Sequence, residues 1–395
     1  MSHGILQRPY EPDSSTPKGS GLAPFWPRRR WLAGASALVL GTGALGAWWG
    51  RRGAARLQPS NPPPSPEVRG TDAPRIQAEV PPIVFGFPTP QERLLDTGDP
   101  AVYMPTASGR LESALYGSVR TVQVGRQVVP SFHEGIDIAP TRRGRGGVAL
   151  DDVWAAADGV VGYINRHAGD SNYGLYVVLV HQDPIGPVYT LYAHLDEIER
   201  SLHVGQPVPR GARLGRMGHT PPHIIPVERS HLHFEVGVIL NQNFPTWYRR
   251  HRFKPDHGLY HGWNLQGLDP LVPYRLQAAG IAFRLQDWAE GTPTAIELSV
   301  RAPRPNYFAE YAACWHVEPG DPRPWILEIS EGGVPLRART GAAEASEVRG
   351  RTPQVVRVDE AVLGRNGRRL VAKANGSWTL GSAGRQWLDI LLWPG

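Results

Sequence analysis

Histidines and an aspartate at short spacings indicate metal chemistry in the middle of this chain. His133 and Asp137 lie four residues apart, and His231 and His233 lie two residues apart much later in the sequence. Alternate side chains on a strand share one face, so both later histidines would face one cleft while Leu232 lies in the core. Imidazole and carboxylate groups are zinc ligands, and three protein ligands with one open position are typical of catalytic zinc sites.

The elements that must position these side chains read as short strands. Residues 231–240 form an apolar and β-branched run, and residues 189–195 alternate like a strand that carries His194 near its end. Across residues 108–273 short strand patterns and Gly/Pro turns dominate, and long helical periods are almost absent. This pattern predicts an all-β domain of antiparallel sheets.

At these positions the sequence resembles the lysostaphin/LytM-type zinc endopeptidases of metallopeptidase family 23, which cut peptide bonds in bacterial peptidoglycan. The family patterns H-x-G-x-D, Y-x-H and H-x-H match residues 133–137, 192–194 and 231–233. A V-x-A-x-x-D-G-x-V hairpin pattern matches residues 153–161. The resemblance covers residues 108–273 and implies the LytM fold, which is similar to the duplicated hybrid motif of glucose permease.

The same resemblance implies roles for five side chains. It implies that a zinc ion is held by His133, Asp137 and His233. It implies that His194 and His231 are catalytic residues that lie beside the metal without binding it. A neutral histidine can take a proton from water, and a second can donate to the developing oxyanion or the leaving amine. The sequence leaves open which of the two is the base.

Two loops and one acidic residue have less certain roles. Residues 141–152 are longer and more basic than the family's usual turn, and residues 220–230 are richer in proline. Because loops tolerate insertions and often determine substrate preference, both are expected to affect specificity more than catalysis. Glu235 shares a strand face with His233, and it either supports the site or is an ordinary solvated side chain.

Composition limits the other classes of function. The chain has 395 residues, of which 41% are hydrophobic and 20% charged, so most of it is globular. A net charge of +6 suits an anionic envelope polymer, and we expect no nucleic-acid partner because no nucleic-acid motif occurs. The single cysteine excludes an internal disulfide and a cysteine-based zinc site. The absence of a G-x-S-x-G pattern argues against a serine hydrolase.

The N-terminal region predicts export. Residues 1–30 form a polar tail, residues 31–50 an apolar helix, and residues 51–80 a proline-rich linker. The apolar segment is either a signal peptide or an uncleaved transmembrane anchor, and its length favours the anchor. Both alternatives place the bulk of the chain in the bacterial envelope, periplasmic or otherwise extracytoplasmic, and the anchor would hold it at the inner membrane.

The remaining segments complete the expected organisation. Residues 81–273 are assigned to the LytM-type domain, and residues 274–395 to a small β-rich accessory domain of unknown role. Within the second, four stretches read as strands and one as a hairpin, which favours a β-sandwich-like module. The expected strands are residues 295–301, 324–329, 355–358 and 387–393, and the expected hairpin is residues 372–381.

The leading hypothesis is a zinc metalloendopeptidase that hydrolyses stem peptides or cross-links of peptidoglycan through metal-activated water with histidine assistance. The alternative is a catalytically inactive LytM-like scaffold that activates cell-wall amidases. A wall-binding protein with a structural zinc is a third class, but structural sites usually have four protein ligands, mostly Cys and His. The sequence specifies neither the scissile bond nor an oligomeric state.

Overall fold

The computed structural model describes residues 80–394 except 125–126, 322 and 342–352. These residues fall in one compact unit. The predicted tail at 1–30, the apolar helix at 31–50 and nearly all of the linker at 51–80 lie outside the described residues. Among the residues that are described, no helix combines the length and apolar character needed to span a bilayer.

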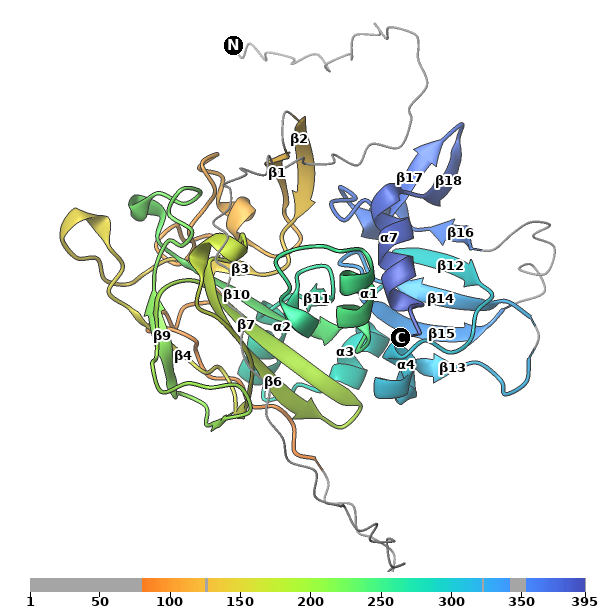
Figure 1. The fold of residues 1–395 in the computed structure, drawn as a ribbon, viewed down its shortest axis with the longest axis horizontal. Coiled ribbons are helices and arrows are strands. Elements are labelled where there is room, and N and C mark those ends of the chain that lie inside the picture. The colour runs from red at the N-terminus through yellow and green to blue at the C-terminus, as the bar shows by residue number, and fades with distance from the viewer. Residues whose placement is uncertain (1–79, 125–126, 322, 342–352, 395) are drawn as a thin grey trace, which may run out of the picture. The chain divides into compact units, whose positions relative to one another are not determined.

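A nine-stranded antiparallel sheet forms the centre of the fold (Figure 1). Its main path runs β11-β10-β7-β6-β5-β8, while β3 pairs with β10 and β9 joins β4 to β7. The strands are β3 (Ile136–Ile138), β4 (Asp152–Trp154), β5 (Gly159–Asn165), β6 (Leu175–Asp183), β7 (Gly186–Ile198), β8 (Pro207–Val208), β9 (Arg213–Met217), β10 (Leu232–Ile239) and β11 (Leu265–Leu268). The predicted antiparallel β architecture is confirmed.

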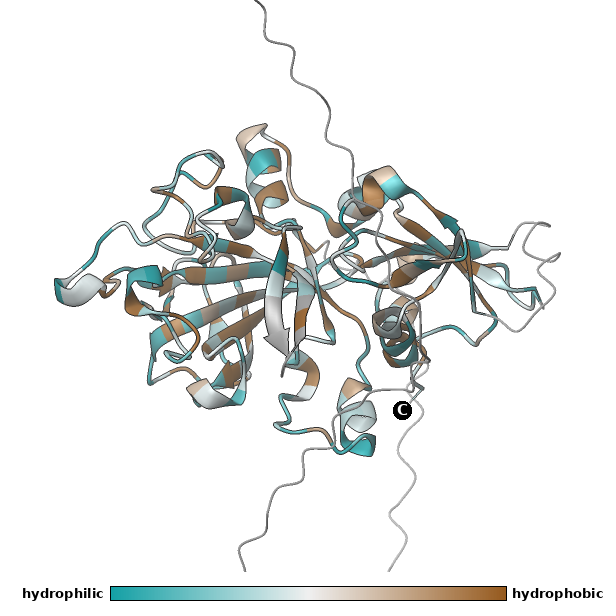
Figure 2. Cartoon of the chain, turned by 90° about the horizontal axis from the view of Figure 1, so that it is seen from above, coloured by the Kyte–Doolittle hydropathy of each residue, from teal (hydrophilic) through white to brown (hydrophobic). Residues whose placement is uncertain are grey.

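Residue alternation along the central strands gives the sheet two different faces, visible as alternating colours in Figure 2. Leu232 and Phe234 of β10 belong to the main apolar core, as expected from the sequence. Tyr176 and Leu191 belong to a smaller cluster on the opposite face. Every residue of β10 is buried, and so is His231 just before it, so His231 and His233 both lie in a largely enclosed setting.

Shorter elements flank the central sheet. A two-stranded ribbon precedes it, formed by β1 (Val119–Val124) and β2 (Gln127–Phe132). Helix α1 (Phe244–Arg250) and helix α2 (Leu271–Ala278) lie before and after β11 in the chain. The short 3-10 turns are η1 (Leu111–Ala114), η2 (Arg145–Gly147), η3 (Ala168–Asp170), η4 (Val227–Arg229), η5 (Gly258–Tyr260) and η6 (Ala312–Cys314).

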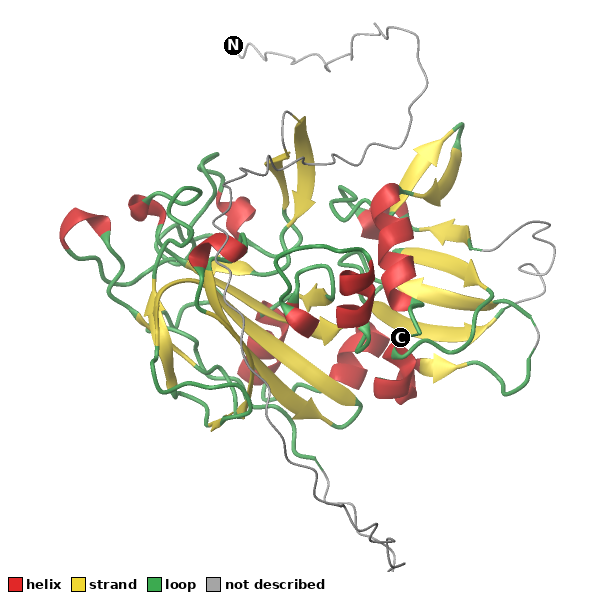
Figure 3. Cartoon of the chain, in the orientation of Figure 1, coloured by secondary structure: helices red, strands yellow, loops and turns green. Residues whose placement is uncertain are grey.

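The C-terminal segment builds a separate five-stranded sheet of order β13-β15-β14-β12-β16, together with helices and a hairpin (Figure 3). Only its β13–β15 pair is parallel. The strands are β12 (Ile296–Val300), β13 (Trp315–His316), β14 (Trp325–Ile329), β15 (Pro335–Thr340) and β16 (Gln354–Val358), and the hairpin is β17 (Val371–Ala374) with β18 (Ser377–Leu380). The helices are α3 (Leu285–Gly291), α4 (Tyr307–Glu310), α6 (Glu360–Leu363) and α7 (Ser382–Leu391).

Two expectations for this segment are wrong. The described residues contribute one sheet and a small hairpin instead of a β-sandwich. The expected strand at residues 387–393 is mostly helix α7, whose buried residues include Gly384, Trp387, Leu388 and Leu391. These positions follow the i, i+3, i+4, i+7 spacing of one helix face, and the tryptophan-rich composition of the segment obscured that period.

The C-terminal segment packs tightly against the central sheet. The indole Nε1 of Trp247 donates to Asp389 Oδ2 at 2.7 Å, and Asn241 Nδ2 donates to the carbonyl oxygen of Ile390 at 2.6 Å. At the β6–β7 turn, a Cβ on Gly186 would lie 2.5 Å from the ring of Tyr311, so this position requires glycine. A single apolar cluster runs through both segments.

The one cysteine of the chain, Cys314, lies in this shared core. Burial raises the pKa of its thiol to about 11. Because the thiolate is the reactive form, Cys314 is expected to be chemically inert in the folded protein.

Candidate metal centre

Strand register places Asp137 beside His233. β10 pairs with β3 so that His233 is directly opposite Asp137, and it pairs with β7 so that His233 is opposite Ala193. Directly opposed residues in an antiparallel pair place their side chains on the same face. His194 follows Ala193 in the chain, so the same three strands bring it to this end of the sheet.

His133 reaches the pair through a close backbone approach just before β3. A Cβ on Gly135 would lie 2.4 Å from the carbonyl oxygen of Phe234, so only glycine permits this approach. The N–H of His133 donates to Ser118, and its carbonyl oxygen accepts from the N–H of Gly117, both at 3.0 Å. The glycine of the H-x-G-x-D pattern therefore has a packing role that places the first histidine.

Three potential ligand atoms form a small triangle. His133 Nε2 lies 3.1 Å from Asp137 Oδ1 and 3.1 Å from His233 Nδ1, and His233 Nδ1 lies 2.9 Å from Asp137 Oδ1. All three residues are buried. Zinc bonds of about 2.0–2.1 Å in tetrahedral geometry place ligand atoms about 3.4 Å apart. A small outward shift of each side chain would therefore accommodate the ion.

Hydrogen bonds on the outer nitrogens fix the orientation of both ligand imidazoles. His133 Nδ1 lies 2.9 Å from the carbonyl oxygen of Leu115, and His233 Nε2 lies 2.8 Å from Glu235 Oε1. An N–H at each of these positions donates outward and leaves the opposite nitrogen free to face the triangle. This pattern is typical of metal-binding histidines.

The side chain of Glu235 is fixed by hydrogen bonds to His233 and to two tyrosines. Its side chain is fully buried, and the hydroxyls of Tyr173 and Tyr189 each donate to its carboxylate at 2.8 Å. The solvated alternative for Glu235 is therefore wrong. Burial alone would raise the pKa of this carboxyl, but the bonds from His233 and the two tyrosines hold it below its usual value. Glu235 is an anion that orients His233.

Arg120 places a positive charge beside the oxygen of Asp137 that does not face the histidines. Its Nη2 lies 2.5 Å from Asp137 Oδ2, leaving Oδ1 of the same carboxylate toward the histidines. Burial raises the pKa of Asp137, but Arg120 and His133 outweigh it and hold that pKa well below its usual range. The aspartate is therefore ionised, which is the form that binds metal.

The donor set favours a cation at its centre. Burial lowers the pKa of His133 to about 4. Burial also opposes charge on His233, but its bonds to Asp137 and Glu235 outweigh that effect and raise its pKa to about 9. In the absence of metal, a proton on His233 and the guanidinium of Arg120 together balance the carboxylates of Asp137 and Glu235. A divalent ion can take the place of that proton among the ligand atoms, so these residues fit zinc.

Two further histidines lie against this triangle. The ring centroid of His194 is 4.8 Å from that of His231 and 5.7 Å from that of His233. His231 Nε2 lies 3.7 Å from Asp137 Oδ1. His194 has a backbone φ of 62°, a conformation uncommon for a residue with a side chain and frequent at functional sites.

The loop at residues 220–230 orients both of these histidines. His194 Nδ1 lies 2.8 Å from the carbonyl oxygen of Thr220, and His231 Nδ1 lies 2.7 Å from that of Arg229. Each Nδ1–H donates to the loop, which leaves Nε2 as the proton-accepting atom. The loop expected to affect specificity thus also positions the predicted catalytic residues.

Burial lowers the pKa of His231 and lowers that of His194 well below its usual value. For His194 the nearby imidazoles of His231 and His233 act in the same direction. Both side chains are therefore neutral near pH 7. A neutral imidazole with a free Nε2 can accept a proton from water.

The two unusual loops meet beside the site. Arg143 of the basic loop donates through Nη2 to the carbonyl oxygen of Ser230 at 3.3 Å, and Arg229 Nε donates to Pro105 at 3.2 Å. Arg229 is partly buried, and Arg143 is exposed. The loops therefore brace each other and form one border of the centre.

All five side chains singled out from the sequence lie together, and their division into ligands and catalytic residues stays a prediction. The sequence analysis missed Arg120, Tyr173 and Tyr189, although residues 116–120 resemble the family's F-G-x-R strand and Tyr173 begins a run similar to its Y-G-x-x-V-x-I-x-H strand. The signal was therefore present for these two. Tyr189 carries no such signal, because its role depends on the cross-strand position of Glu235.

Comparison with known proteins decides the family. Residues 131–244 match the model of peptidase family M23. This segment is an M23 peptidase domain. The M23 match contains all five histidine and aspartate positions described above, and the family predicted from the sequence is confirmed. No curated protein matches the chain.

Solved structures similar to this M23-containing chain include three bacterial proteins. Helicobacter pylori Csd3 is 22% identical with a TM-score of 0.24, over 40% of this chain and 30% of that one. A zinc-containing peptidase from Vibrio cholerae is 28% identical with a TM-score of 0.21, over 34% of this chain and 35% of that one. The catalytic domain of the antimicrobial peptidase lysostaphin from Staphylococcus simulans is 22% identical with a TM-score of 0.23, over 31% of this chain and 77% of that one. The chain thus spans about a third of the length of the first two.

Proposed function

We propose that this chain is a zinc-dependent endopeptidase that hydrolyses peptide bonds in the stem peptides or cross-links of peptidoglycan. The observation that carries the proposal is the triangle of ligand atoms, 2.9–3.1 Å apart, with two neutral histidines against it. The M23 match and the zinc-containing peptidase among the similar structures support it.

In this proposal the metal is held by His133, Asp137 and His233. Zinc in such a site polarises a carbonyl group and lowers the pKa of water to about 7. The chain's own residues perform the proton transfers. Nε2 of either His194 or His231 accepts a proton from the attacking water, and the imidazolium formed in this way donates that proton to the leaving amine.

The substrate and the scissile peptide bond can be identified directly. The purified chain is incubated with peptidoglycan, and the released muropeptides are analysed by mass spectrometry with and without a chelator. We expect chelator-sensitive release of peptide-bond fragments, whose masses identify the scissile bond. Zinc binding without any released fragment would instead support the inactive scaffold that activates cell-wall amidases.

Glu235 offers a test of the metal centre that does not depend on activity. Because its carboxylate orients His233 and completes the charge balance, the substitution Glu235→Gln is expected to weaken zinc affinity about 10–100-fold. Competition with a chromophoric chelator measures this change. The substitution Glu92→Gln removes an exposed carboxylate and should leave zinc affinity unchanged. Equal affinity in both variants would contradict the orienting role of Glu235.

We also propose that the protein acts outside the cytoplasm, attached to the inner membrane by residues 31–50. The support is the uncharged apolar run between arginines in the sequence. Fractionation of cells that produce the full chain, or a chain without residues 31–50, tests this placement. Recovery of both proteins in the cytosolic fraction would contradict it.

A further inference from the structure

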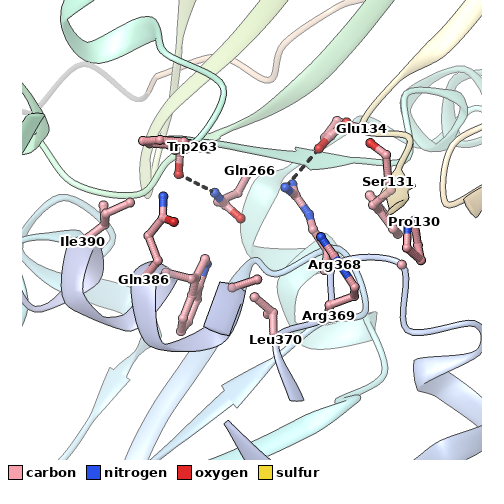
Figure 4. Close-up of a pocket in the computed structure, with 14 residues that line it drawn as sticks. Pro130, Ser131, Glu134, Trp263, Gln266, Arg368, Arg369, Leu370, Gln386 and Ile390 are labelled. Atoms are coloured by element: carbon pink, nitrogen blue, oxygen red, sulfur yellow. Dashed lines mark hydrogen bonds and ion pairs between the residues drawn. The ribbon is translucent and has the colours of Figure 1, made fainter. Parts of the chain in front are cut away.

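A cavity lies between the M23 domain and the C-terminal segment (Figure 4). Its volume is about 240 Å³, below the ~300–1,000 Å³ of most small-molecule sites. It is separate from the candidate metal centre, although Glu134, the neighbour of His133, lines it. Its lining includes Phe132, Glu134, Gln266, Arg368 and Arg369, together with the aromatic side chains of Trp263 and Trp387.

Two buried polar atoms of opposite character lack partners in the residues that line this cavity. They are the acceptor Oε1 of Gln266 and the donor Nη2 of Arg368. Gln266 is only 1% exposed, and its Nε2 donates to the carbonyl oxygen of Trp263 at 3.3 Å, which leaves Oε1 as the spare atom. A buried polar atom without a hydrogen bond costs free energy. A ligand that hydrogen-bonds to both atoms would remove this cost, which favours its binding.

The guanidinium of Arg368 is fixed by three other contacts. Its Nη1 pairs with Glu134 at 3.0 Å, its Nε donates to Gly332 at 2.9 Å, and its plane lies over Phe132 at 5.2 Å. A side chain already held in place loses little conformational freedom when its remaining N–H binds a ligand. Arg368 is therefore a preorganised donor.

The charge of the cavity favours an anion. Glu134 neutralises Arg368, but the exposed Arg369 beside it adds a further positive charge (Figure 4). Trp263 and Trp387 add aromatic surface. A fitting ligand is thus small, carries a carboxylate for the arginines, and carries an N–H donor for Gln266.

We propose that this cavity binds the free carboxyl end of an N-acylated amino acid, which is the chemistry of a peptide C-terminus. The carboxylate accepts from Arg368 Nη2 and from Arg369, and the amide N–H of the terminal residue donates to Gln266 Oε1. The cavity volume suits one or two residues. Such a site would let the protein hold a peptide end while the metal centre acts on another bond.

Calorimetric titration of the full-length, metal-free chain tests this inference. Removal of metal prevents a carboxylate from binding at the metal centre, and it makes the result independent of any peptidase activity. The probes are N-acetylalanine and its amide, which differ only in the carboxylate. We expect saturable binding of the acid and at least about tenfold weaker binding of the amide.

Three variants locate the binding. Arg369→Gln and Gln266→Met should each weaken binding of the acid about 5–10-fold. Arg385→Gln changes the net charge equally on an exposed part of α7 and should have no effect. If Gln266→Met does not fold, Arg369→Gln decides, because its side chain is exposed. Equal binding of acid and amide, equal weakening by the two arginine variants, or no saturable binding would overturn the proposal, and the last would indicate a cavity that holds water only.

Discussion

The substitution His231→Ala is expected to reduce peptidase activity about 10²–10⁴-fold while the protein keeps its zinc. The side chain lies against the ligand triangle, its Nε2 is 3.7 Å from Asp137 Oδ1, and its Nδ1 is hydrogen-bonded to the carbonyl oxygen of Arg229. In the proposed division of roles, its removal eliminates a proton acceptor and no metal ligand. Elemental analysis and the rate of peptide release measure the two effects separately.

The matched comparison is His233→Ala, which removes one corner of the triangle. Here zinc content and activity should fall together, since only Asp137 and His133 would remain and Glu235 would lose its partner. If His231→Ala loses as much zinc as His233→Ala, the division into ligands and catalytic residues is wrong. If His231→Ala retains full activity, His194 alone is the base.

The second large effect is expected in stability. The substitution Trp387→Ala should reduce the free energy of unfolding by about 3–5 kcal/mol, because it empties a site that is 6% exposed in the shared core. Trp387 also donates through Nε1 to the carbonyl oxygen of Gly333 at 3.1 Å. Urea unfolding followed by circular dichroism measures the change.

A matched control lies on the same helix. Arg385→Ala removes an exposed side chain and one hydrogen bond to Leu380, and should change the free energy of unfolding by less than about 0.5 kcal/mol. A fragment that ends at residue 273 should be destabilised more than Trp387→Ala, since Asn241 and Trp247 lose their partners on α7 and the following residues. Equal unfolding midpoints for the fragment and the full chain would contradict a shared core.

The residues of the centre could be predicted because short spacings marked them as metal-binding candidates and the family resemblance implied which of them bind the metal. Two histidines two positions apart on a strand necessarily share a face, and the register then places Asp137 opposite one of them. The supporting groups could not be derived in this way. Tyr189, Glu235 and the carbonyl oxygens of the loop at 220–230 meet only after β7 and β10 pair, and no local pattern encodes those contacts.

The C-terminal segment was harder to predict for a different reason. β12 and β14 lie where alternating β-branched runs predicted strands. Helix α7 was mistaken for a strand because large apolar residues on one helix face also form a dense apolar run in sequence. The cavity beside α7 was likewise invisible, since its lining residues come from widely separated parts of the chain.

Cys314 carries the chain's single thiol, and its burial has a practical consequence. A thiol introduced at the exposed position 369 would be the only one that a maleimide dye could readily modify. A fluorophore attached there would sit at the rim of the cavity beside α7, although its attachment would also replace Arg369. Its emission could report the approach of other molecules to that rim without any background labelling elsewhere.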